Sequence, residues 1–275
     1  MNIINNINRK IAFFDIDGTL TSEIDSSIPE SVFSSLKKAR QNGHLMFINT
    51  GRCFQNVEER FKKIGFDGYV CGCGTDIYVK TDSGLKEILE VHQSNEITEQ
   101  ILQFAGRFEA DLLFESKYEV AFDRSHSFYT KEAKDQFLTF CRLGYNMERN
   151  LMSEDFFCDK FVVWFKHPDD IPEFCKFSDQ YFYCIDRGEN FREFVPHNYS
   201  KATGIKKVMD YYMIPDEDVY AFGDSNNDLS MLSFVKNSIA MGNSLPVSLF
   251  DKVSFVTSKA SENGIENALK HFGFF

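Results

Sequence analysis

The run Asp15-Ile16-Asp17-Gly18-Thr19-Leu20 follows an apolar segment and places two carboxylates two residues apart. On an extended chain these side chains point to the same side, and Gly18 permits a sharp turn directly after them. Paired carboxylates repel one another, so a cation is expected between them. Such a run also occurs as an ordinary strand-to-turn sequence, with glycine at positive φ and threonine capping the next turn. Its partners elsewhere in the chain decide between these two interpretations.

A second acidic run, Gly223-Asp224-Ser225-Asn226-Asn227-Asp228, also follows an apolar segment. Asp224 and Asp228 supply hard oxygen ligands for a divalent cation, and the glycine and asparagines allow a tight turn. A calcium-binding loop is the alternative interpretation. The run lacks the glycine at position six and the final glutamate of an EF-hand, which argues against that alternative.

Two further features suit a phosphate group. The run Asn49-Thr50-Gly51-Arg52 stands at a predicted strand end before a helix, where the Thr50 hydroxyl and the next backbone N–H groups suit a phosphate oxygen. The same residues could instead form a helix cap. Lys201 opens a predicted helix, and a lysine there is usually solvated. It gains a role only if the sheet returns it to the acids, where its ammonium would offset phosphate charge.

The segments around these motifs predict the framework that positions them. Apolar runs lie at 11–15, 44–50 and 68–74, with helical patterns at 31–43 and 53–65 between them. The same rhythm returns late, with a helix at 201–213, apolar runs at 219–224, 238–242 and 253–257, and a last helix near 263–271. Continuous apolar runs separated by amphipathic helices indicate a parallel sheet covered on both faces. We therefore predict an α/β, Rossmann-like core that binds its ligand at the carboxyl edge of the sheet.

The middle of the chain has a different texture. It has helical patterns at 94–108 and 130–142 and aromatic strand candidates at 117–123, 160–167 and 180–186. We predict an inserted α+β cap domain over residues 84–189 and a core formed by residues 1–83 and 190–275. A site in the crevice of a two-domain enzyme is then expected.

Composition excludes several classes of function. The formal net charge is −11 and there is no long basic run, which argues against nucleic-acid partners. No apolar stretch approaches the roughly 18 residues of a membrane helix, and the polar first ten residues do not resemble a secretion signal. Seven scattered cysteines indicate reduced thiols and a cytoplasmic location. Cys71 and Cys73 lack a second cluster that would complete a zinc site.

Taken in chain order, at 15–20, 49–52, 201 and 223–228, the four motifs resemble those of the haloacid dehalogenase-like superfamily, and in particular its Cof-type phosphatases with a large α/β cap. The final segment, 253–275, also looks like the usual ending of that family. The resemblance implies that Asp15 is the nucleophile and that Asp17 is the general acid and base. It also implies a Mg²⁺ ion held by Asp15, the backbone carbonyl of Asp17 and Asp224, with Asp228 acting through water or behind them.

The same resemblance implies further contacts. Thr50, Lys201 and the N–H groups near Gly18 and Gly51 would hold the phosphoryl oxygens, with Arg52 and Asn227 as residues that shape the site. Cys73 departs from the family pattern, because Cof-type proteins often have asparagine in its place. Arg187 and Glu189 in the cap are candidates for substrate contacts, although a solvated turn explains them equally well.

The predicted function is therefore hydrolysis of a small-molecule phosphate ester, with sugar phosphates first and nucleotide-like or pyridoxal phosphates next. The cap would exclude water and select the substrate. A phosphomutase of the same superfamily and a non-catalytic phosphosugar sensor are the alternatives. We expect no nucleic-acid or membrane partner, and a monomer or a homodimer.

Overall fold

The computed structural model describes residues 9–147, 149–153 and 156–275. Within these residues, the α-helices are α1 Glu30–Gln41, α2 Glu59–Lys62, α3 Asn95–Ala105, α4 Lys131–Arg142, α5 Ile171–Ser178, α6 Lys201–Tyr212, α7 Leu229–Phe234 and α8 Gly264–His271. The strands are β1 Ile11–Phe14, β2 Leu45–Asn49, β3 Gly68–Cys71, β4 Asp76–Thr81, β5 Gly84–Glu90, β6 Ala110–Glu115, β7 Val120–Phe122, β8 Lys160–Phe165, β9 Phe182–Asp186, β10 Phe191–Pro196, β11 Val219–Ser225, β12 Asn237–Leu245 and β13 Phe255–Val256. In the described part of the chain, every helix is too short or too polar to cross a membrane.

The chain divides into two compact units. The core unit comprises Met1–Gly51, Val57–Leu89 and Ser200–Phe275, and the cap unit comprises Arg52–Asn56 and Glu90–Tyr199. We predicted boundaries after residues 83 and 189. The division falls later at both places, because β5 belongs to the sheet of the core unit and β10 belongs to the sheet of the cap unit.

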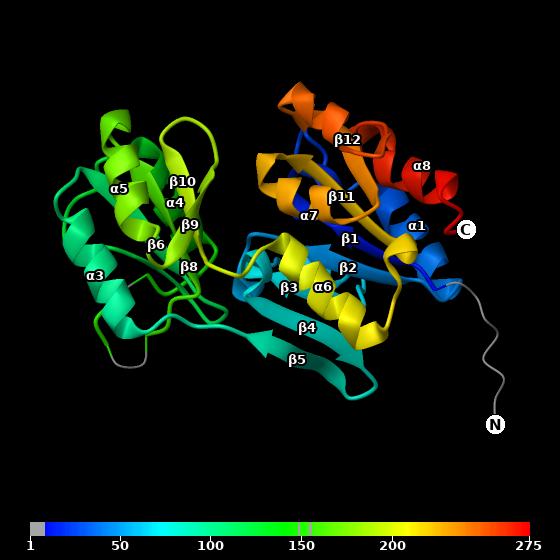
Figure 1. Cartoon of the computed structure of the whole chain (residues 1–275), viewed down its shortest axis with the longest axis horizontal. Coiled ribbons are helices and arrows are strands. Elements are labelled where there is room, and N and C mark those ends of the chain that lie inside the picture. The colour runs from blue at the N-terminus through cyan, green and yellow to red at the C-terminus, as the bar shows by residue number, and fades with distance from the viewer. Residues whose placement is uncertain (1–8, 148, 154–155) are drawn as a thin grey trace. The chain divides into compact units, whose positions relative to one another are not determined.

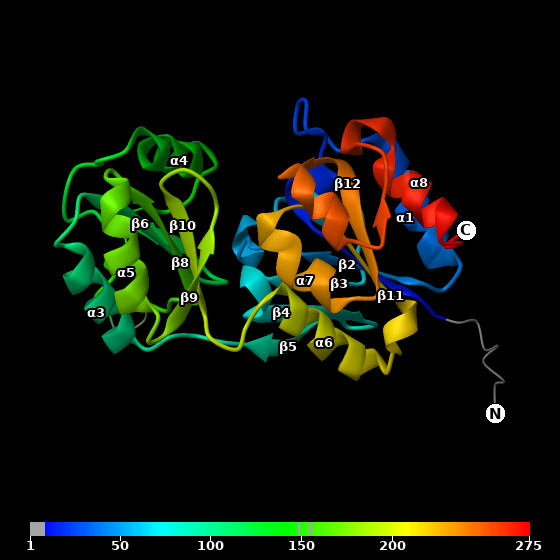
Figure 2. The same ribbon diagram turned by 45° about the horizontal axis from the view of Figure 1, so that its top comes forward.

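The core unit contains an eight-stranded sheet in the order β13-β12-β11-β1-β2-β3-β4-β5. Its strands from β13 to β3 run parallel, and β4 is antiparallel to β3. Ile11 and Phe13 of β1 pack into one apolar cluster with residues of α6 and α7. Figures 1 and 2 show α6 and α7 on one face of the sheet, with α1 and α8 side by side on the other. The parallel, doubly covered core predicted from the apolar runs is confirmed.

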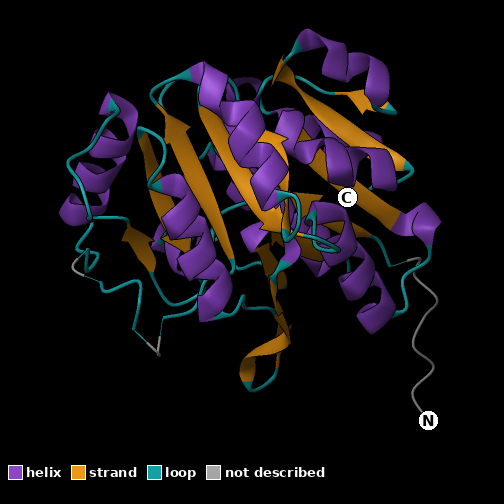
Figure 3. Ribbon diagram, turned by 60° about the vertical axis from the view of Figure 1, so that its left-hand side comes forward, coloured by secondary structure: helices purple, strands orange, loops and turns teal. Residues whose placement is uncertain are grey.

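The cap unit contains a five-stranded antiparallel sheet in the order β7-β6-β8-β10-β9. Alternate residues of β6 enter different apolar clusters, since Leu112 and Phe114 pack with α3 and α5 whereas Leu113 packs with α4. Helices therefore cover both faces of this sheet. Figure 3 distinguishes the strands from the helices that pack on them in each unit.

One predicted element is wrong. The helix expected over 53–65 is limited to α2, Glu59–Lys62, with a single 3-10 turn at Phe54–Asn56 before it. Cys53 is buried in the α4-side apolar cluster of the cap unit, and the Tyr145 hydroxyl donates a hydrogen bond to the Gln55 carbonyl oxygen at 3.0 Å. A segment whose side chains pack in the cap cannot also continue a helix of the core.

Candidate active site

The register of the parallel strands brings three motifs to one edge of the core sheet. Phe14, the last residue of β1, pairs with Ile48 of β2 on one side and with Phe222 of β11 on the other. The residues that follow these strands therefore lie together at the carboxyl edge of the sheet. Asp15 follows β1, Thr50 follows β2, and Asp224 lies two residues beyond Phe222.

Three carboxylates gather at this edge. Carboxylate oxygens of Asp15, Asp224 and Asp228 all lie within 4.8 Å of one another. Asp15 is 4% exposed and Asp228 is fully buried, so water screens little of their mutual repulsion. Asp17 is exposed on the turn after β1. Its predicted contribution to a metal site through the backbone carbonyl stays a prediction.

Lys201 joins two of these acids from the first turn of α6. Its Nζ atom donates hydrogen bonds to Asp15 Oδ1 and to Asp228 Oδ1, each at 2.6 Å. The Ser200 side chain caps this helix by accepting from the Thr203 N–H, and Asn49 Nδ2 donates to the Lys201 carbonyl oxygen at 3.0 Å. The position of the ammonium is thus set at the helix start, and Lys201 does not lie on a solvated face.

Burial and mutual repulsion shift the pKa values of the charged groups in this cluster. Burial raises the pKa of Asp224 to about 8, and the carboxylates of Asp228 and Asp15 add to the rise. Burial also raises the pKa of Asp15 to about 6, although the Lys201 ammonium opposes the shift. Burial lowers the pKa of Lys201, but Asp15 and Asp228 outweigh it and the net shift is upward. One ammonium does not neutralise three acids.

The loop at 223–228 is organised by Asp228. Its Oδ2 atom accepts hydrogen bonds from the backbone N–H groups of Asp224, at 2.9 Å, and Ser225, at 3.1 Å. A Cβ atom on Gly223 would lie 2.6 Å from the Asp228 Cβ atom, so this close turn requires glycine. Asn227 accepts a hydrogen bond from the Ser225 hydroxyl and belongs to the same loop.

The turn after β1 depends on Gly18. Its φ is +72°, and a Cβ atom there would lie 2.3 Å from Asp224 Oδ2, so only glycine allows this approach. The Gly18 N–H donates to Thr21 Oγ1 at 3.1 Å, and Asn243 Nδ2 donates to the Gly18 carbonyl oxygen at 2.8 Å. Asn243 was not among the residues predicted from the sequence. It follows the apolar run 238–242, and a position directly after an apolar run is the signal that marked the motifs at Asp15, Thr50 and Asp224.

Thr50 and Cys73 lie in adjacent loops of the core unit. Thr50 is 2% exposed, and its carbonyl oxygen accepts from the Cys73 N–H at 3.1 Å. Cys73 is buried and adopts a left-handed conformation, with φ 56° and ψ 34°. Asparagine is several-fold enriched in this region of the Ramachandran map. The departure from the family pattern at Cys73 therefore occurs at a backbone position that suits the more usual residue.

Of the remaining predicted residues, Gly51 directly follows Thr50 in the core unit, whereas Arg52, Arg187 and Glu189 belong to the cap unit. Arg52 Nη1 donates to the Asn56 carbonyl oxygen at 3.4 Å. Arg187 and Glu189 lie exposed on the turn between β9 and β10, where Arg187 Nη1 lies 3.3 Å from Glu193 Oε2. A role for Arg187 and Glu189 in substrate binding stays a prediction.

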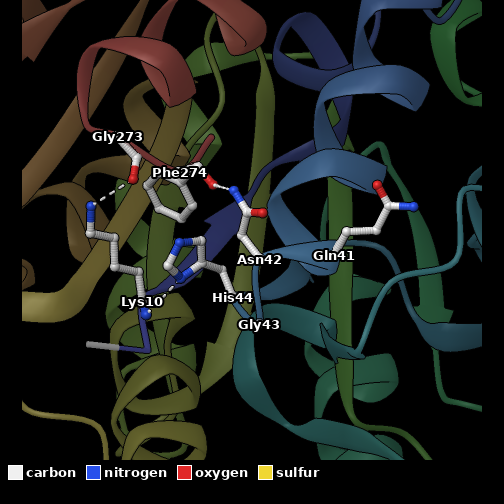
Figure 4. Close-up of a pocket in the computed structure, with 7 residues that line it drawn as sticks. All are labelled: Lys10, Gln41, Asn42, Gly43, His44, Gly273 and Phe274. Atoms are coloured by element: carbon white, nitrogen blue, oxygen red, sulfur yellow. Dashed lines mark hydrogen bonds between the residues drawn. The ribbon is translucent and has the colours of Figure 1, made fainter. Parts of the chain in front are cut away.

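A depression of about 630 Å³ lies at the opposite edge of the core sheet. Its residues include Lys10 and His44, which precede β1 and β2. Figure 4 shows Lys10 directed at Gly273, and Asn42 at Phe274. Because these polar groups bind the end of the chain, and because ligands of parallel α/β sheets bind at the carboxyl edge, this depression is not the candidate active site.

The acids at the carboxyl edge fit a hard divalent cation. Their donor atoms are all oxygens, which Mg²⁺ prefers. Burial and the neighbouring acids raise the pKa values of Asp15 and Asp224, and a bound cation would favour their ionised forms. Asp228 already accepts from Lys201 and from two backbone N–H groups, so Asp15 and Asp224 are the better placed direct ligands.

Comparison with known proteins agrees with this geometry. The model of the haloacid dehalogenase-like hydrolase family matches residues 12–269. The Bacillus subtilis (strain 168) protein "Putative phosphatase YkrA" is 28% identical over 268 residues, which cover 96% of this chain and 98% of that protein. The 5-amino-6-(5-phospho-D-ribitylamino)uracil phosphatase YitU of the same organism is 24% identical over 272 residues, covering 94% and 95%.

A solved structure shows the same fold. BT4131, described as a sugar phosphatase of HAD subclass IIB, superposes with a TM-score of 0.80 at 24% identity, covering 97% of this chain and 100% of that one. The predicted fold class, an α/β core with an inserted α+β cap domain, is therefore confirmed.

Proposed function

The chain belongs to the haloacid dehalogenase-like hydrolase family and is a phosphatase, and from this premise we propose that it hydrolyses small phosphorylated metabolites with Mg²⁺ through a phosphoryl group carried on Asp15. The observation that supports the proposal most directly is the approach of Asp15, Asp224 and Asp228 within 4.8 Å, with Lys201 Nζ 2.6 Å from Asp15. A nucleophile, a cation site and a fixed positive charge then coincide at one edge of the sheet.

In this mechanism Asp15 attacks the phosphorus atom and displaces the alkoxide of the substrate. Asp17 protonates that alkoxide, which is otherwise a poor leaving group, and then takes a proton from the water that cleaves the aspartyl-phosphate. Exposure of Asp17 is compatible with proton exchange with solvent. Asp15 must be ionised to attack, and the hydrogen bond from Lys201 favours that ionised form.

Other residues stabilise the phosphoryl group. An ammonium carries three N–H donors, and two of those of Lys201 serve Asp15 and Asp228, so the third is available to a phosphoryl oxygen. The Thr50 hydroxyl and the N–H of Gly51 would contact the other oxygens. A Mg²⁺ ion held by Asp15, Asp224 and the Asp17 carbonyl, with Asp228 behind, would neutralise negative charge beside the phosphoryl group.

The substrate class is proposed as sugar phosphates first. YitU acts on a phosphoribityl compound by its name, so a sugar-alcohol phosphate attached to a heterocycle is a second member of the same class. The test is hydrolysis of an aryl phosphate with and without Mg²⁺, followed by a panel of hexose, pentose and ribityl phosphates compared by kcat/KM.

The products distinguish the alternatives. Release of inorganic phosphate that stops on chelation of the metal supports the proposal. An isomerised hexose phosphate without free phosphate would indicate a mutase, and binding without turnover would indicate a sensor. Equal rates with EDTA and with Mg²⁺ would overturn the metal dependence.

A further inference from the structure

Two cysteines of the cap unit lie in direct contact. Cys175 is on α5 and Cys184 is on β9, and their Sγ atoms are 3.0 Å apart. The bond in a disulfide is about 2.05 Å long, so about 1 Å separates this contact from a covalent link. Both thiols are half-buried, whereas Cys53, Cys71, Cys73 and Cys158 are buried. The pair is therefore both close and accessible.

The packing around the pair holds the two sulfur atoms together. Cys175 directly follows the buried Phe174 on α5, and Cys184 is two residues after the buried Phe182 on β9. These rings belong to one apolar cluster, and α5 leads into β9 through a short turn in which Tyr181 N–H donates to Ser178 at 3.0 Å. The two cysteines thus lie on elements that are joined by a short turn and packed against one apolar cluster.

We propose that Cys175 and Cys184 are a redox modification site, which closes as an intramolecular disulfide on reaction with hydrogen peroxide and reopens with a dithiol. The Cys175 thiolate attacks one peroxide oxygen, forms a sulfenic acid and releases water after protonation. Cys184 then attacks that sulfur, and a second water leaves. Two thiols lose two electrons in total and peroxide gains them.

Electrostatics favours Cys175 as the first nucleophile. The hydrogen bond between the two thiols lowers the pKa of Cys175, and the nearby Arg192 guanidinium adds to this shift. The thiolate is the reactive form of cysteine. Arg192 lies on β10 opposite Asp186, two residues from Cys184 on the neighbouring strand. Closure would tie the edge strand β9, which leads to the turn carrying Arg187 and Glu189, to α5.

The test uses the full chain, reduced and then treated with stoichiometric hydrogen peroxide. Thiols are counted under denaturing conditions, and peptides are mapped without reduction. We expect two of the seven thiols to disappear together, a crosslinked peptide joining residues 175 and 184, and full recovery with dithiothreitol. These readouts need no variant protein and do not depend on the proposed function.

Matched serine variants distinguish this pair from general oxidation. Cys175→Ser and Cys184→Ser should each abolish the paired loss, whereas Cys141→Ser, at the exposed cysteine, should leave it unchanged. Intermolecular dimers through Cys141 as the main product, or sulfenic acid at Cys175 that never yields the crosslink, would overturn the proposal. Melting curves of the variants verify that each is folded.

Discussion

A buried lysine lies between two acids in each unit of the molecule. In the core, Lys201 contacts Asp15 and Asp228 at 2.6 Å. In the cap, Lys160 contacts Glu115, and its Nζ lies 2.9 Å from Glu193 Oε1. Both lysines are at most 2% exposed. By local geometry alone the two clusters are alike.

Their charge balance differs. In the cap, Arg187 also contacts Glu193 at 3.3 Å, so two cations face two acids. In the core, Asp224 joins the cluster as a third acid facing one ammonium. The cap cluster can therefore be internally neutral, whereas the acids of the core cluster outnumber its lysine, which is the basis for the cation proposed there. The surplus of acid, and not the buried ion pair as such, is what distinguishes the proposed active site from the cap cluster.

The largest effect should come from the proposed nucleophile. Asp15→Asn removes the attacking carboxylate, and we expect kcat/KM for an aryl phosphate to fall by about 10⁴-fold or more. The matched cap variant is Glu115→Gln, which removes the charge of an acid beside Lys160. It should change kcat/KM by less than about tenfold, which is smaller than the effect of removing a catalytic group. Equal losses of kcat/KM in the two variants would mean that the core cluster has no greater role in catalysis than the cap cluster.

The next largest effect concerns stability of the cap. Lys160→Met leaves Glu115 and Glu193 buried with one cation fewer, which should lower the free energy of unfolding by about 3–5 kcal/mol. Trp164, the single tryptophan, lies on the same strand and reports unfolding of the cap by fluorescence in urea.

Lys166→Met is the matched control for that variant. Lys166 forms an ion pair with Glu109 in which both side chains are 44% exposed. Its loss should cost less than about 1 kcal/mol. A Lys160→Met protein as stable as this control would mean that the cap network contributes nothing to folding.

A further effect should appear in the pH dependence of the metal-free protein. The pKa of Asp224 rises from 3.8 to about 8 and that of Asp15 to about 6 on folding. The folded state therefore binds more protons, and the stabilising contribution present below pH 3.8 is lost as pH rises through about 6 and then about 8. Melting temperatures should fall between pH 5 and pH 8, and less steeply in Asp224→Asn.

Mg²⁺ should offset part of that loss. At 100 times its dissociation constant, a ligand of the folded state adds about 2.7 kcal/mol of stability. We expect this gain at pH 8 in the wild-type protein and little gain in Asp224→Asn, measured by calorimetry. The same stabilisation in both proteins would place the cation away from the acids.

The smallest effect should come from Cys73, which lies close enough to Lys201 to contribute to the raised pKa of that lysine. Because asparagine tolerates positive φ, Cys73→Asn should change stability by less than about 1 kcal/mol. Cys73→Val should cost about 1–3 kcal/mol, since a β-branched residue is strained there. Urea titration measures both, and a large loss in the asparagine variant would show that the thiol itself is required.

Much of the core could be predicted from the sequence. The apolar runs before Asp15, Thr50 and Asp224 predicted parallel strands, and parallel strands of one sheet end at a common edge. That topological rule places distant acids together without knowledge of any contact. The family resemblance added the roles of these residues, which remain proposals until they are tested.

The cap network could not be predicted in this way. Glu115, Lys160 and Glu193 stand on antiparallel strands, and which side chains meet depends on a register that no motif marks. The helix expected over 53–65 failed for a related reason, because its apolar pattern suited a helix while Cys53 was buried in the cap unit. Local periodicity does not reveal which unit a side chain will join.

The amino-acid sequence by itself determined the parallel strands of the core in chain order and the acids that end them, because these follow from periodicity and chain direction, whereas β4 and β5 were not predicted as core strands. Only the tertiary structure decided that Lys201 bridges Asp15 and Asp228 and that burial and the neighbouring acids raise the pKa of Asp224 although the Lys201 ammonium opposes the rise. Those outcomes depend on distances and burial, which set the strength of each charge interaction and are properties of the packed molecule.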